Sequence, residues 1–312
     1  MSRIVLAPVA ALAFAAGACV FTLGPIEQVK PSIDAEVVDA PADASTDGPC
    51  DPTKPFQQPT RITALDTDAN DELWPRLTPD ELTMVFSTKR APANAFGAFI
   101  TTRSARDAEW AAPTSIDGIS AAGAFDSDPM ITPDGDRLFF ASNRGGGSAD
   151  IYSATRDRNG AFVNPLLVPE LNTNADEFQP FVAFDGSEIW LTRVIANQSR
   201  ILRAESNGGT IAQPNVVPEL TSTGDDWLPT PSADGLTLYF ASTRPGGKGD
   251  YDIWVARRPT KTSPFERPSI VDELDGPALD APGWLSVDGC RLYFHRCRES
   301  TSCDLFLAEK PK

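Results

Sequence analysis

One acidic residue stands eight positions before an aspartate in each of five similar segments of the chain. Carboxylates placed at a fixed spacing can bind a cation or the basic group of a partner, and two at a defined separation can hydrolyse a glycosidic bond. We therefore treat the five acids as a candidate binding ring. They are Glu72, Asp126, Glu177, Asp226 and Asp280.

The same segments also offer these acids a structural partner. Ten positions after the central aspartate, four of the segments carry an arginine: Arg90, Arg144, Arg244 and Arg298. Folding a segment back about its aspartate brings acid and arginine together, and we favour such bidentate ties over ligand binding. In the third segment that position is Ile195, and the nearest arginine, Arg193, is out of register. Glu177 is therefore expected to be the free carboxylate.

Aromatic residues and one histidine are the other candidates for chemistry. Trp74, Phe178, Trp227 and Trp284 follow the acids closely and could stack on a sugar or a peptide, although we favour packing between neighbouring segments. His295 is the only histidine, which leaves little for a histidine-based triad or a multi-histidine metal site, and we interpret it as structural. We predict no metal and no cofactor, and leave open only a cation held by the ring of acids.

The five cysteines fall into two kinds. Cys297 and Cys303 flank one short turn, and Cys50 precedes a segment expected to reach the sheet edge where Cys290 lies. In an oxidising compartment this placement predicts the disulfides Cys297–Cys303 and Cys50–Cys290. Cys19 remains for another role.

Five internal repeats must position these residues, and they predict the fold. The central aspartates are spaced by 54, 51, 49 and 54 residues and are Asp80, Asp134, Asp185, Asp234 and Asp288. A period near fifty, with an aspartate turn between apolar runs, is typical of one four-stranded antiparallel blade. We expect the first strand to follow a proline, or Gly283 in the fifth repeat. The sequence thus predicts an all-β, five-bladed β-propeller over residues 56–312, with six blades as the alternative.

The fifth repeat ends before its fourth strand. Phe56-Gln57-Gln58-Pro59 has the spacing of Phe265-Glu266-Arg267-Pro268, which opens the fourth strand of repeat four. We expect residues 56–65 to supply the missing outer strand. Such a strand would close the ring and remove an open sheet edge.

Two of the repeats carry a family resemblance. SDPMITPDGDRLFFASNRGGGSADIYSATR and DDWLPTPSADGLTLYFASTRPGGKGDYDIWVARR resemble the PD40, or WD40-like, repeats of TolB-type propellers of bacterial envelopes. The resemblance covers essentially the whole folded body, and repeat one departs from it at Asp80-Glu81. TolB itself has six blades and an extra N-terminal domain, so the resemblance implies the fold and the compartment, not a specific role.

The N-terminal residues predict export. A basic start and an apolar run from Ile4 to Ala16 are typical of a signal peptide, here residues 1–18. The small residues before Cys19 resemble a bacterial lipobox, which implies acylation of Cys19; an ordinary A-x-A cleavage site is the alternative. Val20 after the cysteine implies sorting to the outer membrane. Residues 19–55 are acidic and rich in Pro and Ala, and we expect them to form a disordered tether.

Charge and motifs narrow the function. With 43 acids against 27 Lys and Arg, a net charge of -16 excludes nucleic acid as a partner. No nucleophile–base motif accompanies the repeats. We predict a monomeric, lipid-anchored, non-catalytic propeller in the periplasm that binds an envelope protein or a polysaccharide such as peptidoglycan. The alternative is a carbohydrate-active hydrolase or lyase that uses Glu177 with Glu72 or Asp226.

Overall fold

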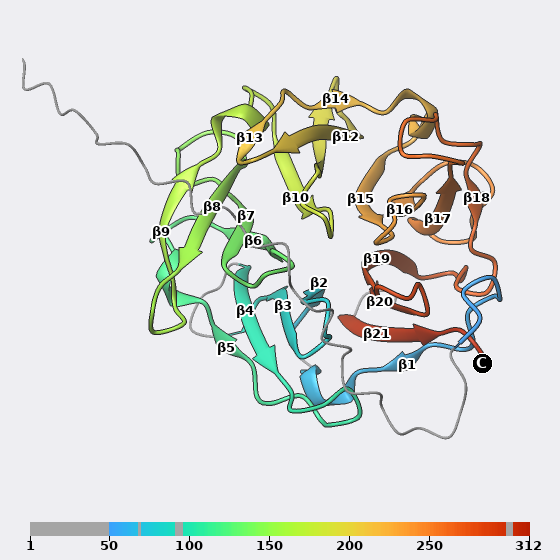
Figure 1. Ribbon diagram of the computed structural model, residues 1–312, viewed down its shortest axis with the longest axis horizontal. Coiled ribbons are helices and arrows are strands. Elements are labelled where there is room, and N and C mark those ends of the chain that lie inside the picture. The colour runs from blue at the N-terminus through green and yellow to red at the C-terminus, as the bar shows by residue number, and fades with distance from the viewer. Residues whose placement is uncertain (1–49, 68–69, 91–95, 298–301) are drawn as a thin grey trace, which may run out of the picture. The chain divides into compact units, whose positions relative to one another are not determined.

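The computed structural model describes residues 50–67, 70–90, 96–297 and 302–312. The predicted signal peptide, Cys19, most of the predicted tether and Arg298 lie outside them. Five antiparallel sheets are arranged in a ring (Figure 1), so the predicted all-β, five-bladed propeller is confirmed. No helix in the described part of the chain is long and apolar enough to cross a membrane.

Each blade runs from an inner strand to an outer strand. Blade one holds β2 (Glu72–Leu77), β3 (Thr83–Thr88), β4 (Gly97–Thr102) and β5 (Thr114–Ser115). Blade two holds β6 (Asp126–Ile131), β7 (Arg137–Ser142), β8 (Asp150–Arg156) and β9 (Phe162–Leu167). Blade three holds β10 (Glu177–Val182), β11 (Glu188–Ile195), β12 (Gln198–Asn207), β13 (Thr210–Ile211) and β14 (Asn215–Val216).

The last two blades complete the ring. Blade four holds β15 (Asp226–Pro231), β16 (Thr237–Ser242), β17 (Asp252–Arg257) and β18 (Ser269–Ile270). Blade five holds β19 (Leu279–Leu285), β20 (Arg291–Cys297), β21 (Cys303–Glu309) and β1 (Thr60–Arg61). Single 3-10 turns lead into the inner strands of blades one to four: η1 (Thr63–Leu65), η2 (Asp117–Ile119), η3 (Pro169–Leu171) and η4 (Pro218–Leu220).

The N-terminal strand closes the ring as predicted. β1 pairs antiparallel with β21, and Thr60 lies opposite Leu307. The predicted disulfides are confirmed: Cys50 bonds Cys290 at the start of β20, and Cys297 bonds Cys303. Residues 50–55, the end of the predicted tether, are held against the propeller, since Asp51 N–H donates to Pro311 O at 3.0 Å. The disulfide and the closing strand together fix this segment in place.

The apolar core lies between the blades. The second strand of every blade presents an equivalent side chain to it, and all five are fully buried: Phe86, Phe140, Leu191, Phe240 and Phe294. Burying one such side chain stabilises the fold by about 2 kcal/mol. The repeated apolar face therefore explains why five similar segments assemble into one ring.

The inner strands differ from expectation at their prolines. In blades one to four the inner strand begins at its acid, so Pro75, Pro129, Pro180 and Pro229 lie inside the strand and do not precede it. The pairing with the second strand shifts register there in every blade. A proline fits such a bulge, because it offers no N–H to the ladder.

The residue before each of these prolines has a left-handed backbone. The φ angles are 57° at Trp74, 53° at Asp128, 49° at Gln179 and 56° at Leu228. This conformation is strained for residues other than glycine, and a bulge redirects the side chain. In blade five the bulge holds Gly283, where a Cβ would lie 2.5 Å from Pro75 O, so glycine permits the close contact between blades five and one.

Candidate functional site

The predicted ring of acids is buried. The five side chains stand at the start of the inner strands, and each residue is at most 4 % exposed: Glu72, Asp126, Glu177, Asp226 and Asp280. Burial raises the pKa of Glu72, and it raises that of Asp280 to about 6. The ring therefore does not offer five free carboxylates to solvent.

In three blades the acid pairs with the predicted arginine. A hydroxyl residue lies directly opposite the acid, as Ser242 does opposite Asp226, and the arginine follows two positions later. Arg244 Nη2 is 2.7 Å from Asp226 Oδ1, and Arg90 Nη2 is 3.2 Å from Glu72 Oε1. Arg144 pairs in the same way with Asp126.

In the other two blades the arginine itself lies opposite the acid. Arg193 Nε is 2.6 Å from Glu177 Oε1, so Glu177 is not free and the prediction was wrong on this point. In the hairpin, the residue eight positions before the turn aspartate pairs with the residue eight positions after it, so Arg193 lies directly opposite Glu177. Arg296 Nε is likewise 2.5 Å from Asp280 Oδ1, in the role predicted for Arg298.

Each arginine also donates to the connection that enters its blade. The accepting backbone oxygens are those of Leu65, Ile119, Leu171, Leu220 and Leu274. We call each set of acid, arginine and carbonyl an acid–arginine tie. Every tie joins the first strand, the second strand and the preceding connection, so its geometry is structural.

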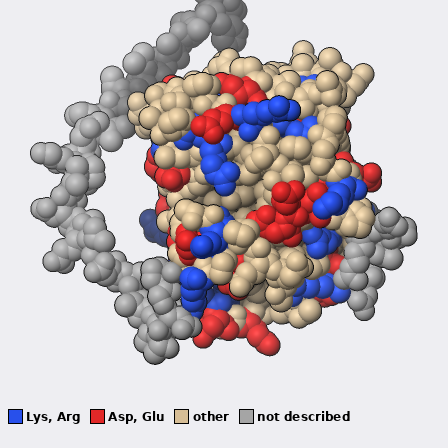
Figure 2. All heavy atoms as spheres, turned by 90° about the vertical axis from the view of Figure 1, so that its right-hand side faces the viewer, with Lys and Arg blue, Asp and Glu red and all other residues tan. Residues whose placement is uncertain are grey.

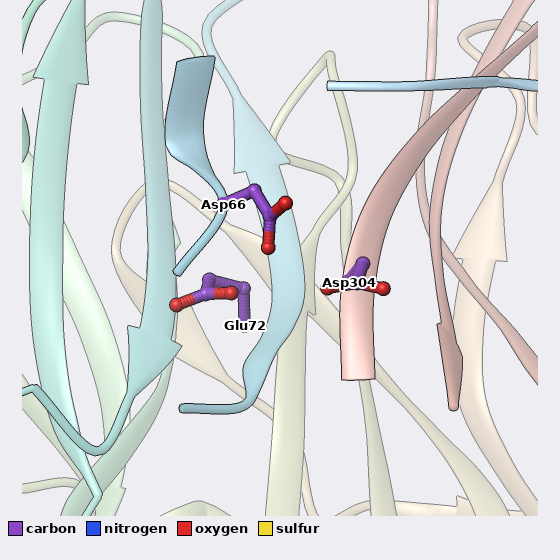
Figure 3. A group of neighbouring side chains, drawn as sticks. All are labelled: Asp66, Glu72 and Asp304. Atoms are coloured by element: carbon purple, nitrogen blue, oxygen red, sulfur yellow. The ribbon is translucent and has the colours of Figure 1, made fainter. Parts of the chain in front are cut away.

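One group of three acids in the described part of the chain has the spacing of metal ligands: Asp66, Glu72 and Asp304 (Figure 3). Arg61 Nη2 lies 2.6 Å from Asp66 Oδ2 and 2.6 Å from Asp304 Oδ1. The guanidinium thus supplies the positive charge that a cation would bring, and Glu72 belongs to its own tie. We assign no cation to this group.

The charged side chains on the surface form no single-sign field on the face that Figure 2 shows. Lysine and arginine lie among aspartate and glutamate there. An exposed ion pair joins blades three and four, with Lys261 Nζ 2.5 Å from Asp185 Oδ2. The charge pattern of this face therefore does not single out a binding site.

A concave site lies around the propeller axis, where the inner strands of blades one to four begin. Its volume is about 350 Å³. Six aromatic side chains line it: Trp74, Phe96, Phe125, Phe178, Trp227 and Tyr251. Five polar residues complete it: Ser127, Asp128, Gln179, Thr192 and Ser199. We call this site the aromatic cup.

The rings of the aromatic cup pack in pairs. Ring centroids are 5.6 Å apart for Trp74 and Phe96, 6.4 Å for Phe125 and Phe178, and 4.9 Å for Trp227 and Tyr251. These contacts hold the rings in fixed positions around the opening, at separations typical of aromatic pairs. The cup is thus a preformed site.

Of the four aromatic residues singled out from the sequence, three line the cup and Trp284 does not. Trp284 is 1 % exposed and packs against Tyr293 and Phe184. It stands four residues after its acid, beyond the register shift, whereas Trp227 stands one residue after its acid. The shift carries Trp284 into the core.

Buried polar atoms in the cup lack hydrogen-bond partners among the described residues. They are the donors Trp74 Nε1 and Trp227 Nε1 and the acceptors Asp128 Oδ1 and Gln179 Oε1. Burial raises the pKa of Asp128 to about 7. Unpaired buried polar atoms are uncommon in proteins, and four of the eleven among the described residues line the cup.

Arg76 crosses the axis next to the cup. It is buried, its Nη1 donates to Thr230 Oγ1 of blade four at 3.4 Å, and its guanidinium lies 5.0 Å from the Phe181 ring of blade three. Burial lowers the pKa of Arg76 to about 9, which leaves it a cation at neutral pH. Its charge attracts the Asp128 carboxylate and partly offsets the cost of burying it.

His295 is a buried neighbour of the cup. Its ring centroid lies 6.3 Å from that of Trp74, edge to face. Burial lowers the pKa of His295 to about 3, so the imidazole is neutral. The structure gives it a packing role beside Trp74.

Sequence reasoning missed Phe96, Phe125, Tyr251, Asp128 and Gln179. The repeat alignment held a signal for three of them, because Phe96 and Tyr251 directly precede a third strand and Phe125 directly precedes an acid. Asp128 and Gln179 gave none, because their placement depends on the left-handed bulge.

Comparisons with known proteins show a shared fold. No family model matches the chain, and no curated protein matches it. TolB from Acinetobacter baumannii is 17% identical with a TM-score of 0.45, over 80% of this chain and 56% of that one. A putative TolB from Agrobacterium tumefaciens is 18% identical with a TM-score of 0.49, over 81% and 80%. A thermostable family-43 glycoside hydrolase is 14% identical with a TM-score of 0.50, over 77% and 89%.

Proposed function

We propose that this protein is an exported, lipid-anchored, non-catalytic propeller that binds an envelope protein or polymer in the aromatic cup. One observation carries the proposal: six aromatic rings from four blades surround an open site that no segment of the described chain fills. Ligand sites in proteins are concave, mostly apolar and largely preformed, with a few polar groups that fix orientation. The cup has each of these properties.

The ties support binding over hydrolysis. A glycosidase needs two carboxyl groups with separate roles. Glu72, Glu177 and Asp226 are each buried in a tie with an arginine. Asp128 is the one carboxyl among the described residues that line the cup. The candidates for a catalytic pair are therefore engaged elsewhere.

The point where an anchor would join the propeller supports an outward-facing cup. Cys50 is bonded to Cys290 at the turn end of the hairpin of blade five. The aromatic cup lies at the other end of the inner strands, beside their acids. A tether from Cys19 would thus reach the propeller on the face opposite the cup and leave the cup open to a partner.

Cys19→Ala tests the anchor. We expect the wild-type protein in the membrane fraction and the variant in the soluble periplasmic fraction, with Trp110→Phe, which keeps Cys19, behaving as wild type. Unchanged membrane association of Cys19→Ala would contradict the anchor.

Cross-linking in cells tests the partner. Wild type and Trp110→Phe should capture the same molecule, and Trp227→Ala should lose it. Capture by all three proteins would contradict a role for the cup.

A further inference from the structure

We infer that the aromatic cup binds a neutral saccharide. The inference rests on the proposed function of the cup and names its ligand class. Three independent properties of the described lining residues point to it: the kind of apolar surface, the hydrogen-bonding groups and the charge.

The apolar surface of the cup is entirely aromatic. Six lining residues are Trp, Phe or Tyr, and no described lining residue is Leu, Ile, Val or Met. Grooves that accept varied apolar side chains of protein partners often use flexible methionine side chains. Flat, fixed rings instead suit a ligand with flat C–H faces and a polar edge, which describes a sugar ring.

The polar groups of the cup are of both hydrogen-bonding kinds. The indole N–H groups of Trp74 and Trp227 only donate, whereas Asp128 Oδ1, when ionised, and Gln179 Oε1 only accept. A ligand that satisfies all of them must both donate and accept at its edge. A hydroxyl group does both, and a saccharide carries several around each ring.

The charge of the cup disfavours ionic ligands. No lysine or arginine is among the described lining residues, so an anionic sugar or a phosphate finds no lining cation. Asp128 is the only lining carboxyl, and buried Arg76 compensates it. An organic cation would satisfy the acceptors and the ring faces, yet it would leave the two indole donors unpaired. A neutral ligand that carries hydroxyl groups can pair with both the acceptors and the indole donors of the cup.

The bulge of the inner strands places three of the lining residues. Trp74, Asp128 and Gln179 all have left-handed φ angles, and all three line the cup. Leu228 of blade four has the same conformation and does not line the cup, so the bulge belongs to the repeat and the identity of the side chain decides what reaches the site. Three blades thus use the same bulge to aim different side chains at one point.

Titration of the purified protein, followed by tryptophan fluorescence, tests the inference. The neutral probes are cellotetraose, xylotetraose, maltotetraose and tetra-N-acetylchitotetraose, and the charged probes are tetragalacturonate and tetralysine. We expect saturable binding of at least one neutral probe and none of the charged ones. Trp227→Ala should weaken binding by roughly ten-fold or more, and Trp227→Phe, which keeps a ring and loses the N–H, by roughly three-fold.

Trp110→Phe is the matched control, because Trp110 stacks on Arg103 in blade one and does not line the cup. It should bind as wild type. If Trp227→Ala fails to fold, the graded loss in Trp227→Phe decides. The inference is overturned if no neutral probe binds at concentrations up to about 10 mM, the range in which weak ligands bind. It is also overturned if a charged probe competes for the cup, or if Trp227→Ala binds the neutral probe as wild type does. Cup-dependent capture of a protein without any saccharide binding would sink this inference and leave the proposed function standing.

Discussion

The acid–arginine ties and the aromatic cup are adjacent, yet they are built in opposite ways. Every blade repeats the tie with an aspartate or a glutamate, an arginine and a backbone carbonyl, and each acid pairs with its arginine. The cup begins one or two residues farther along the inner strands of blades one to four, where the side chains differ between blades. Four polar atoms of the cup have no partner among the described residues.

This contrast shows how a repeat protein separates stability from function. Positions that every repeat fills in the same way hold the blades together, so their charged groups are already paired within the fold. Positions that differ between repeats are free to form one asymmetric site at the axis, where all the inner strands meet. A charge that recurs in every blade is thus weaker evidence of a binding site than a side chain that differs from its equivalents in the other blades.

Breaking a tie should give the largest loss of stability. Asp226→Asn removes the charge that Arg244 pairs with and leaves a buried guanidinium without its anion. We expect the free energy of unfolding to fall by about 4 kcal/mol, measured by urea denaturation. The matched variant Asp234→Asn changes an exposed turn aspartate of the same blade and should cost much less. Equal losses in the two variants would mean that the tie is not structural.

Opening the ring closure should give the next largest loss. Replacing Cys50 and Cys290 together by alanine frees the segment before β1, and we expect unfolding to become easier by about 3 kcal/mol. The pair Cys297→Ala and Cys303→Ala should cost less, because a disulfide across a sequence separation of only 6 removes less entropy from the unfolded chain than one across 240. Denaturation of both double variants under non-reducing conditions compares them. The reverse order would contradict the closing role of Cys50–Cys290.

Protonation of Asp128 in the cup should make the free energy of unfolding depend on pH. The pKa of Asp128 is raised from 3.8 to about 7 on folding, so the folded state holds this proton more tightly than the unfolded chain. Stability is therefore lost as the pH rises from about 4 to about 7, by an amount of the order of 4 kcal/mol for this group. Asp128→Asn should flatten that slope, whatever its effect on stability at a single pH.

Urea denaturation of wild type and Asp128→Asn at several pH values between 4 and 8 measures the two slopes. Asparagine tolerates the left-handed backbone at this position, so the variant tests charge rather than strain. Asp280, whose pKa is raised to about 6, contributes equally to both proteins. Identical slopes in the two proteins would show that Asp128 is not a buried carboxyl of the aromatic cup.

The repeats made most of the fold predictable. Period, turn and apolar alternation are local properties, so the aspartate turns predicted five blades, and the spacing of Phe56 and Pro59 predicted the closing strand. The register of Arg193 was not predictable from a fixed offset, because blades three and five place the arginine directly opposite the acid. Trp284 was misplaced for a similar reason, since a bulge changes which side chains reach the axis.

The cup itself depends on closure of the ring. Phe96 and Tyr251 are far apart in the sequence and line one site only because blades one and four both face the axis. No local pattern encodes that proximity. The sequence therefore suggested aromatic residues for stacking, and only the assembled propeller shows which of them share a site.

The six tryptophans provide the most direct test of the central claim, that the cup is the binding site and the rest of the repeat is structural. Trp74 and Trp227 line the cup, whereas Trp110, Trp190, Trp254 and Trp284 do not. In an NMR titration of protein labelled with ¹⁵N at the indoles, the neutral tetrasaccharide that binds should shift the Trp74 and Trp227 signals and leave the other four in place. Shifts confined to the other four tryptophans, or no shift at all, would contradict the account.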